Sequence, residues 1–303
     1  MFPSMNFIVS LLIFLQLFQN SCENNITKVH DKKFSKEQYY NGIKGKSAKE
    51  LKTELSSIIG NPHVLEYREI WMAFMLTDAT PDGKVWDMYS DNPQHQTAYK
   101  FDFRKDKCST YKKEGDCYNR EHSFPKSWFS NAFPMYTDLF HIYPTDGYVN
   151  SKRGNLPFGE VGIFAWKSTN DSKIGKNVSG NYRGYVFEPN DAYKGDLART
   201  YFYMVTAYEN LLPTWKSPQL SGNKYPGFSD WSLQILLKWH KEDPVSNKEI
   251  ERNEAVFKIQ RNRNPFIDYP QLVEHIWGNQ KSIPFLFQKQ IKMEKYPKNK
   301  KAA

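Results

Sequence analysis

The chain has 303 residues, and its formal charge of +9 favours an acidic partner such as nucleic acid or anionic lipid. Six Lys and one Glu fall in the last fifteen residues, so that stretch carries +5 and the rest of the chain only +4. The chain outside the last fifteen residues is therefore not uniformly basic. Any nucleic-acid-binding surface on that part must be a local basic patch. The 21 Phe, 19 Tyr and 8 Trp residues are enough to build a sizeable core.

The N-terminus is predicted to be a signal peptide, because the first 22 residues carry no charged side chain and residues 7–18 form an apolar run. This run is too short to span a bilayer. Cleavage near Ser21 would release a secreted or periplasmic protein, whereas cleavage before Cys22 would allow its lipidation and leave a membrane-anchored lipoprotein. We therefore expect four segments: a signal peptide over 1–22, a polar segment over 23–35, one domain over 36–288 and a Lys-rich tail over 289–303.

Several helices and one strand are predicted from apolar spacing and from start and stop signals. Ser47 and Glu50 form a capping-box pattern that predicts a helix to residue 59, ended by Gly60. The expected elements that follow are a helix over 64–76, a strand over 85–89, a largely buried helix over 196–212 ended by Pro213, a helix over 233–239, and a helix over 246–259 opened by a second capping box.

The segment between residues 118 and 155 has the pattern of a β-hairpin followed by a short helix. Residues 118–124 and 139–143 each have the length of a strand, and Pro144 is expected to end the second. Thr145 and Asp146 can then cap a helix that holds Asn150. This arrangement would bring polar side chains from both strands and the helix together.

Glu121 and His122 are the candidate catalytic pair of this segment. Because neighbouring residues on a strand point to opposite sides, we expect His122 to face a reacting phosphate and Glu121 to reach a metal ion. Asn150 offers an amide oxygen to the same ion, and carboxylate and amide oxygens suit Mg²⁺. A neutral imidazole suits removal of a proton from water. Taken singly, each residue has a structural interpretation: a core histidine, a surface charge and a helix cap.

Taken in order, these motifs resemble the endonuclease I family of secreted or periplasmic nucleases. Residues 119–125, Asn-Arg-Glu-His-Ser-Phe-Pro, are similar to the family's Arg-Glu-His-x-x-Pro signature, and residues 138–155 are similar to its second strand and helix. Segments between 230 and 278 resemble its C-terminal run, including Asp-Trp at 230–231 and Asn-Pro-Phe-Ile-Asp-Tyr-Pro at 264–270. The resemblance covers about residues 36 to 280.

The resemblance implies an α+β fold in which a ββα-metal (His-Me) finger is embedded in a mainly helical single domain. It implies a secreted, Mg²⁺-dependent and largely non-specific endonuclease that leaves 5′-phosphate ends, with Mn²⁺ or Ca²⁺ able to replace Mg²⁺ in binding. His122 would be the general base, with Glu121 and Asn150 as metal ligands. The expected partner is DNA, with RNA as a second candidate, bound mainly through its phosphates. We expect a monomer without a small-molecule cofactor.

The sequence departs from the family pattern between the two strands. Family members with a longer loop there supply an arginine to the scissile phosphate, but here Lys126 is the only cation between His122 and Asp138. The role of His141 stays open between orienting His122, a purely structural one and metal ligation. The cations that remain candidates for phosphate contact are Arg120, Lys126 and Arg153.

Cys108 and Cys117 lie nine residues apart in a polar loop that contains Lys and Gly. In an oxidising compartment this pattern favours a disulfide over a metal pair.

Two other functions stay open from the sequence. The chain could be a secreted nucleic-acid-binding protein without activity, although the intact Glu121, His122 and Asn150 argue against this. It could also be a zinc hydrolase that uses His122 and His141, but it lacks a tight ligand cluster such as His-Glu-x-x-His.

Overall fold

The computed structural model describes residues 35–287. The predicted signal peptide, Cys22 and the Lys-rich tail therefore lie outside the described residues. The chain divides into a unit over residues 1–39 and a unit over residues 40–303. Of the first unit, the structure describes the short helix α2 (Lys36–Tyr39). The backbone amide of Gln38 in this helix donates to the hydroxyl of Ser35, which precedes it. All elements below belong to the second unit.

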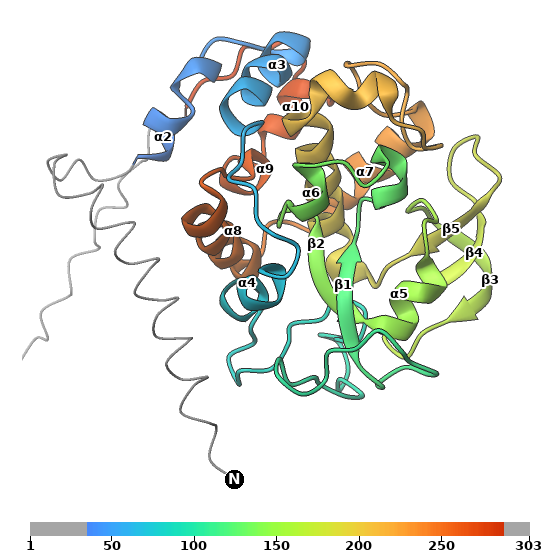
Figure 1. Ribbon diagram of the computed structural model, residues 1–303. Coiled ribbons are helices and arrows are strands. Elements are labelled where there is room, and N and C mark those ends of the chain that lie inside the picture. Colours follow the sequence, from blue (N-terminus) through green and yellow to red (C-terminus); the bar gives the residue numbers. More distant parts are fainter. Residues whose placement is uncertain (1–34, 288–303) are drawn as a thin grey trace, which may run out of the picture. The chain divides into compact units, whose positions relative to one another are not determined.

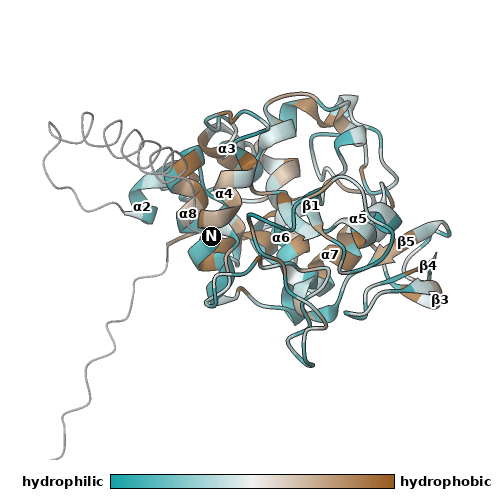
Figure 2. Ribbon diagram, turned by 60° about the horizontal axis from the view of Figure 1, so that its bottom comes forward, coloured by the Kyte–Doolittle hydropathy of each residue, from teal (hydrophilic) through white to brown (hydrophobic). Residues whose placement is uncertain are grey.

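Helix α6 (Lys194–Ala207) lies at the centre of this unit (Figure 1). Nearly every residue of the helix is buried. It packs against α3 and α7, and the Phe202 ring stacks on Trp277 at 4.8 Å between centroids. Burial of one such apolar side chain stabilises the fold by roughly 1.5–3 kcal/mol. Hydrophobic residues lie mainly on helices and strands, whereas the connecting loops are largely hydrophilic (Figure 2). The other helices are α3 (Ala48–Ile59), α4 (Ile70–Thr77), α5 (Gly147–Arg153), α7 (Asp230–Glu242), α8 (Asn247–Gln260), α9 (Pro265–Asp268) and α10 (Leu272–Ile276).

Two small antiparallel sheets accompany the helices. The first pairs β1 (Tyr118–His122) with β2 (Ile142–Asp146), so that Glu121 lies opposite Tyr143. The second has the order β3 (Val161–Lys167), β4 (Lys173–Asn177) and β5 (Tyr185–Glu188). Helix α5 follows β2 directly. The β1–β2 pair is fixed to α6 by hydrogen bonds, among them Tyr143 Oη to Thr200 Oγ1 at 2.7 Å and Tyr201 Oη to the Ser123 carbonyl at 2.9 Å.

Most of the predicted helices are confirmed. Helix α3 ends before Gly60, and α7 covers the predicted 233–239 with extra turns at both ends. The second capping box forms, with the Ser246 hydroxyl accepting from the Glu249 amide and the Glu249 carboxylate from the Ser246 amide. The long helix over 196–212 is α-helical only to Ala207 and continues as the 3₁₀ helix η5 (Glu209–Thr214), which contains Pro213.

Four local predictions are wrong. The Ser47 side chain makes no cap hydrogen bond, and the Glu50 carboxylate pairs with Lys46 at 2.7 Å. The helix predicted over 64–76 begins only at Ile70. The strand over 85–89 is irregular chain, since its backbone groups bond to separate partners such as the Asp87 carboxylate. Pro144 lies inside β2, where a two-stranded sheet tolerates its missing N–H. The sequence interpretation also missed the β3–β4–β5 sheet.

Candidate active site

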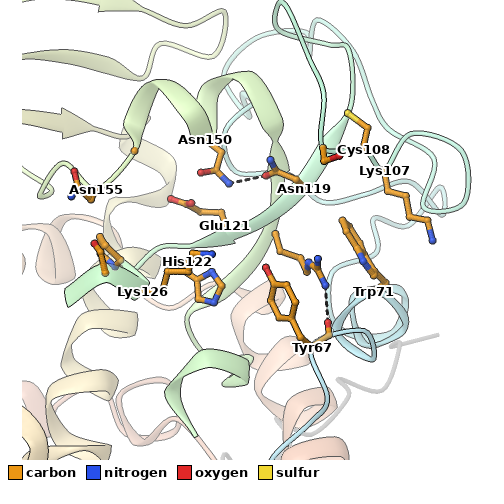
Figure 3. A pocket seen from close by; sticks show the side chains of 15 residues that line it. Tyr67, Trp71, Lys107, Cys108, Asn119, Glu121, His122, Lys126, Asn150 and Asn155 are labelled. Atoms are coloured by element: carbon orange, nitrogen blue, oxygen red, sulfur yellow. Dashed lines mark hydrogen bonds between the residues drawn. The ribbon is translucent and has the colours of Figure 1, made fainter. Parts of the chain in front are cut away.

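The candidate residues line a cavity of about 720 Å³ beside β1 (Figure 3). Strand β1 and helix α5 form one side of this cavity, and the segment that leads into α4 forms another. Of the residues named from the sequence, the cavity brings together His122, Glu121, Asn150, Arg120 and Lys126. Its further lining residues are Tyr67, Trp71, Lys107, Cys108, Ser109, Asn119, Pro125, Ser127, Gly154 and Asn155.

His122 ends β1 and is only 5% exposed. Its Nε2 lies 3.1 Å from the Tyr136 carbonyl oxygen. Since a carbonyl only accepts, Nε2 must carry the proton, and Nδ1 then carries the lone pair. Burial, with the neighbouring His141 adding to it, lowers the pKa of His122 from 6.5 to about 3. The imidazole is therefore neutral at pH 7, with a defined tautomer.

Glu121 is 3% exposed and accepts two hydrogen bonds on the same oxygen. Tyr89 Oη donates to its Oε1 at 2.9 Å and Arg153 Nη1 at 2.8 Å. Among residues 35–287, Oε2 has no hydrogen-bond partner. Burial raises the pKa of Glu121, while the charge of Arg153 opposes that rise and favours the carboxylate. The side chain is thus held in one orientation with one oxygen free.

Asn150 is placed by the first turn of α5. The Asp146 carboxylate caps this helix by accepting from the Val149 amide at 2.9 Å, as predicted. The Asn150 amide group donates through Nδ2 to Asn119 Oδ1 at 2.7 Å, which directs its own oxygen away from Asn119. Figure 3 shows the side chains of Glu121 and Asn150 pointing toward one another.

The donor set fits one hard cation better than zinc. Glu121 and Asn150 offer a carboxylate and an amide oxygen to the same cavity, and Mg²⁺ is commonly held by one or two protein oxygens together with water and substrate. No three His, Cys, Asp or Glu side chains within residues 35–287 are arranged to hold a metal ion. His122 and His141 direct their Nε2 atoms at separate carbonyl groups, which disfavours the zinc alternative.

Arg153 does not occupy the position expected of a phosphate contact. It is fully buried on the inward face of α5 and does not line the cavity. Its guanidinium donates to Glu121, to the carbonyls of His122 and Ser123, and to Tyr201 Oη. The sequence prediction for Arg153 is therefore corrected: its hydrogen bonds hold Glu121. The sequence does contain a signal for this burial. Arg153 lies four residues after Val149, so both side chains project from the same face of α5, and Val149 is buried.

His141 is fully buried behind the site. Its Nε2 lies 2.6 Å from the Met135 carbonyl oxygen, and its ring centroid is 5.4 Å from that of His122. Burial lowers the pKa of His141. These contacts fit a structural role at the back of His122. Lys126, in contrast, is exposed at the cavity edge, with Nζ 5.5 Å from the Tyr136 ring centroid.

Among the cavity residues that were not assigned to the site from the sequence are Tyr67, Trp71 and Lys107. The Arg120 guanidinium carbon lies 3.5 Å from the Tyr67 ring centroid and 4.4 Å from that of Trp71. Lys107 Nζ lies 5.7 Å from the Trp71 ring. These residues come from segments up to fifty residues before β1, so no local motif connects them to His122.

The predicted disulfide between Cys108 and Cys117 is present, with a Cα–Cα distance of 5.8 Å. It links the loop that carries Lys107 to the residue that precedes β1. The bond thus fixes one rim of the cavity to the strand that bears Glu121 and His122.

Comparison with known proteins identifies the family. Residues 47–271 match the model of the family described as Endonuclease I. An extracellular ribonuclease of Bacillus amyloliquefaciens is 36% identical over 246 residues, which cover 80% of this chain and 78% of the relative. The chain belongs to the endonuclease I family. An extracellular ribonuclease of Bacillus subtilis (strain 168) is 35% identical over 244 residues, covering 79% of this chain and 78% of the relative.

Membership makes this endonuclease I family protein an enzyme, a nuclease that acts on nucleic acid, and confirms the resemblance inferred from its motifs. A more distant relative, an extracellular deoxyribonuclease of Aeromonas hydrophila, is 26% identical over 135 residues, covering 44% of this chain and 50% of the relative. The names of these relatives support the predicted secreted or periplasmic location. Between residues 35 and 287, no helix has the length and apolar character needed to cross a membrane.

Proposed function

We propose that this nuclease is a secreted, Mg²⁺-dependent endonuclease that cleaves phosphodiester bonds with little sequence preference and leaves 5′-phosphate ends. One observation carries the proposal: a neutral histidine with an available Nδ1 and a carboxylate with a free oxygen come from adjacent residues of β1 and line one cavity. In this proposal, β1, β2 and α5 would together form a ββα-metal finger, and their order along the chain supports it.

In this proposal, His122 removes a proton from the attacking water. Its Nδ1 accepts the proton while Nε2 stays bonded to the Tyr136 carbonyl, so the imidazolium that forms keeps its position. The water oxygen forms a bond to phosphorus and the bond from phosphorus to O3′ breaks, which leaves the phosphate on the 5′ side of the next nucleotide. The O3′ atom takes a proton from solvent.

Glu121 and Asn150 would hold the metal ion. When bound, Mg²⁺ would neutralise charge on the phosphate and on the leaving oxygen. The chain's contribution is to orient the two oxygen ligands: Arg153 and Tyr89 fix the Glu121 carboxylate, and Asn119 fixes the Asn150 amide. Such supporting hydrogen bonds commonly change metal affinity by about 10–100-fold.

The substrate is proposed to be DNA and RNA, bound mainly through phosphates. Relatives named ribonuclease and deoxyribonuclease support both polymers. Three cations line the cavity, namely Lys107, Arg120 and Lys126, and each comes from a different segment. Together they form a local basic patch, which a nucleic acid needs because the chain outside its C-terminal tail carries little net charge. Phosphate contacts position a nucleic acid without reading its bases, which suits low sequence preference.

The proposal is tested by nicking of supercoiled plasmid and by cleavage of a labelled RNA, each in Mg²⁺ and in EDTA. Wild-type protein should cleave only with Mg²⁺, His122→Ala should lose cleavage, and His63→Ala, a change at an exposed histidine, should keep it. Cleavage in EDTA, or undiminished cleavage by His122→Ala, would sink this mechanism. Binding without any cleavage by wild-type protein would favour the inactive nucleic-acid-binding alternative.

A further inference from the structure

A layered stack of side chains holds Arg120 on the cavity wall. Its guanidinium lies between the rings of Tyr67 and Trp71, and the Tyr67 ring stacks in turn on Tyr136 at 4.6 Å between centroids. Arg120 Nη1 also donates to the Tyr67 carbonyl at 2.7 Å. The position and plane of this guanidinium are therefore fixed before any ligand arrives.

The fixed guanidinium retains donors for a ligand. Arginine has five N–H donors, and a single hydrogen bond of Arg120 is formed within residues 35–287. Arg120 lines the cavity. The planar fork of an arginine matches two oxygens of a phosphate. A group held between two rings, with unused donors on a cavity wall, is arranged for an anion.

Arg120 also lies on the same side of β1 as His122. Residues two apart on a strand project to one face, so Arg120 and His122 share a face, whereas Glu121 projects to the other. Both side chains contact Tyr67, whose ring centroid lies 6.1 Å from the His122 ring at an interplanar angle of 24°. A phosphate attacked by water at His122 would thus be within the neighbourhood of Arg120.

The other cations are less suited to this task. Arg153 is buried and bonded to Glu121. The long side chains of Lys126 and Lys107 lie over ring faces at 5.5 and 5.7 Å, and no hydrogen bond from residues 35–287 orients them. A lysine is a point charge on a flexible stem, whereas electrostatic stabilisation of a transition state benefits from a donor fixed in advance.

We propose that Arg120 is a catalytic residue that donates to a non-bridging oxygen of the scissile phosphate, in place of the inter-strand loop arginine that this chain lacks. The inference rests on the proposed phosphodiester cleavage at His122. Tyr67 and Trp71 act as positioning residues, because they hold the guanidinium plane.

The test is single-turnover cleavage of a labelled DNA oligonucleotide in saturating Mg²⁺. Arg120→Met keeps a side chain between the rings but removes the charge, and it should lower the cleavage rate by about 10²–10³-fold. Arg120→Lys should fall between Arg120→Met and wild type. The matched control is Arg68→Met, since the Arg68 side chain is 83% exposed and does not line the cavity.

Chemical rescue separates a catalytic role from a structural one. Arg120→Ala leaves a slot between two aromatic rings, which millimolar guanidinium should fill by cation–π contact and thereby restore part of the rate. Ammonium at the same concentration should not. This measurement also decides the question if Arg120→Met does not fold.

Two results would overturn the inference while leaving the proposed function intact. The first is an Arg120→Met rate within about threefold of wild type when His122→Ala is inactive. The second is a change confined to substrate affinity and its salt dependence, which would mean contact with a neighbouring phosphate. Loss of Mg²⁺-dependent cleavage in wild type, or an active His122→Ala, would instead refute the proposed function itself.

Discussion

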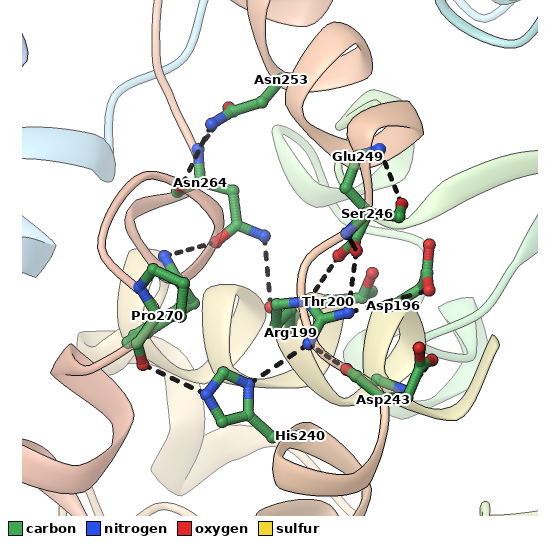
Figure 4. A network of polar contacts seen from close by, with 12 residues as sticks. Asp196, Arg199, Thr200, His240, Asp243, Ser246, Glu249, Asn253, Asn264 and Pro270 are labelled. Atoms are coloured by element: carbon green, nitrogen blue, oxygen red, sulfur yellow. Dashed lines mark hydrogen bonds and ion pairs between the residues drawn. The ribbon is translucent and has the colours of Figure 1, made fainter. Parts of the chain in front are cut away.

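Replacing His240 with glutamine should remove an acid-sensitive group from the packing between α7 and α6. His240 Nε2 lies 3.1 Å from the Pro270 carbonyl oxygen, and Nδ1 lies 3.5 Å from Arg199 Nη1 (Figure 4). The carbonyl requires a proton on Nε2 and the guanidinium requires a lone pair on Nδ1. The fold therefore holds a neutral His240, and a second proton would face Arg199 without an acceptor.

The size of the expected change in the free energy of unfolding follows from the pKa of His240. Burial, with the charge of Arg199 adding to it, lowers the pKa of His240 from 6.5 to about 4. Between these values the unfolded chain binds more protons than the folded one, so the free energy of unfolding rises with pH across this window. From pH 7.5 down to pH 5, protonation of the unfolded chain costs about 2 kcal/mol of stability.

Urea denaturation of wild type and His240→Gln at both pH values measures this contribution. Glutamine can accept from Arg199 and donate to the Pro270 carbonyl, but it does not titrate. Wild type should therefore lose about 2 kcal/mol more than the variant on going to pH 5. Asp243, whose pKa burial raises to about 6, contributes with the opposite sign in both proteins and cancels in the difference. Equal losses in the two proteins would refute the reasoning.

Three further changes test the fold around the site. Replacing Cys108 and Cys117 by Ser should lower the free energy of unfolding by about 2–3 kcal/mol in non-reducing buffer. Equal free energies of unfolding for wild type and the variant in that buffer would contradict this. Arg153→Met leaves the buried Glu121 carboxylate without its positively charged partner and should cost about 3–5 kcal/mol, whereas adding Glu121→Gln should recover part of the loss in thermal unfolding. Ser246→Ala removes the cap of α8 and should cost about 1 kcal/mol by urea denaturation; no loss would mean that the cap is not stabilising.

Local signals predicted the parts of this fold that depend on neighbouring residues. The Ser246 and Glu249 capping box formed because both partners lie within one turn, and the Glu249 side chain is held buried beside Arg199. The same pattern at Ser47 did not form: the Glu50 carboxylate pairs with the adjacent Lys46, and the Ser47 side chain makes no cap hydrogen bond. The strand predicted over 85–89 failed for a similar reason, since the Asp87 carboxylate binds backbone amides and no ladder forms.

The site was predictable only where its residues lie on one short segment. Glu121, His122 and Asn150 fall within thirty residues, and their spacing led to the cavity in which they meet. The Arg120 stack was not predictable, because Tyr67 and Trp71 reach β1 through tertiary packing. The buried position of Arg153 depends on which side of α5 faces the core, and an arginine there is uncommon unless it is paired.

The assignment of a metal ion and a general base to this cavity can be measured by calorimetric titration of Mg²⁺ into wild type, His122→Ala and Glu121→Gln, paired with cleavage assays. We expect His122→Ala to bind the ion as wild type does but not to cleave. Glu121→Gln should weaken binding by at least about tenfold, because the variant loses the charged ligand. Unchanged Mg²⁺ affinity in Glu121→Gln, or cleavage by His122→Ala at the wild-type rate, would contradict the assignment of a metal and a base to this cavity.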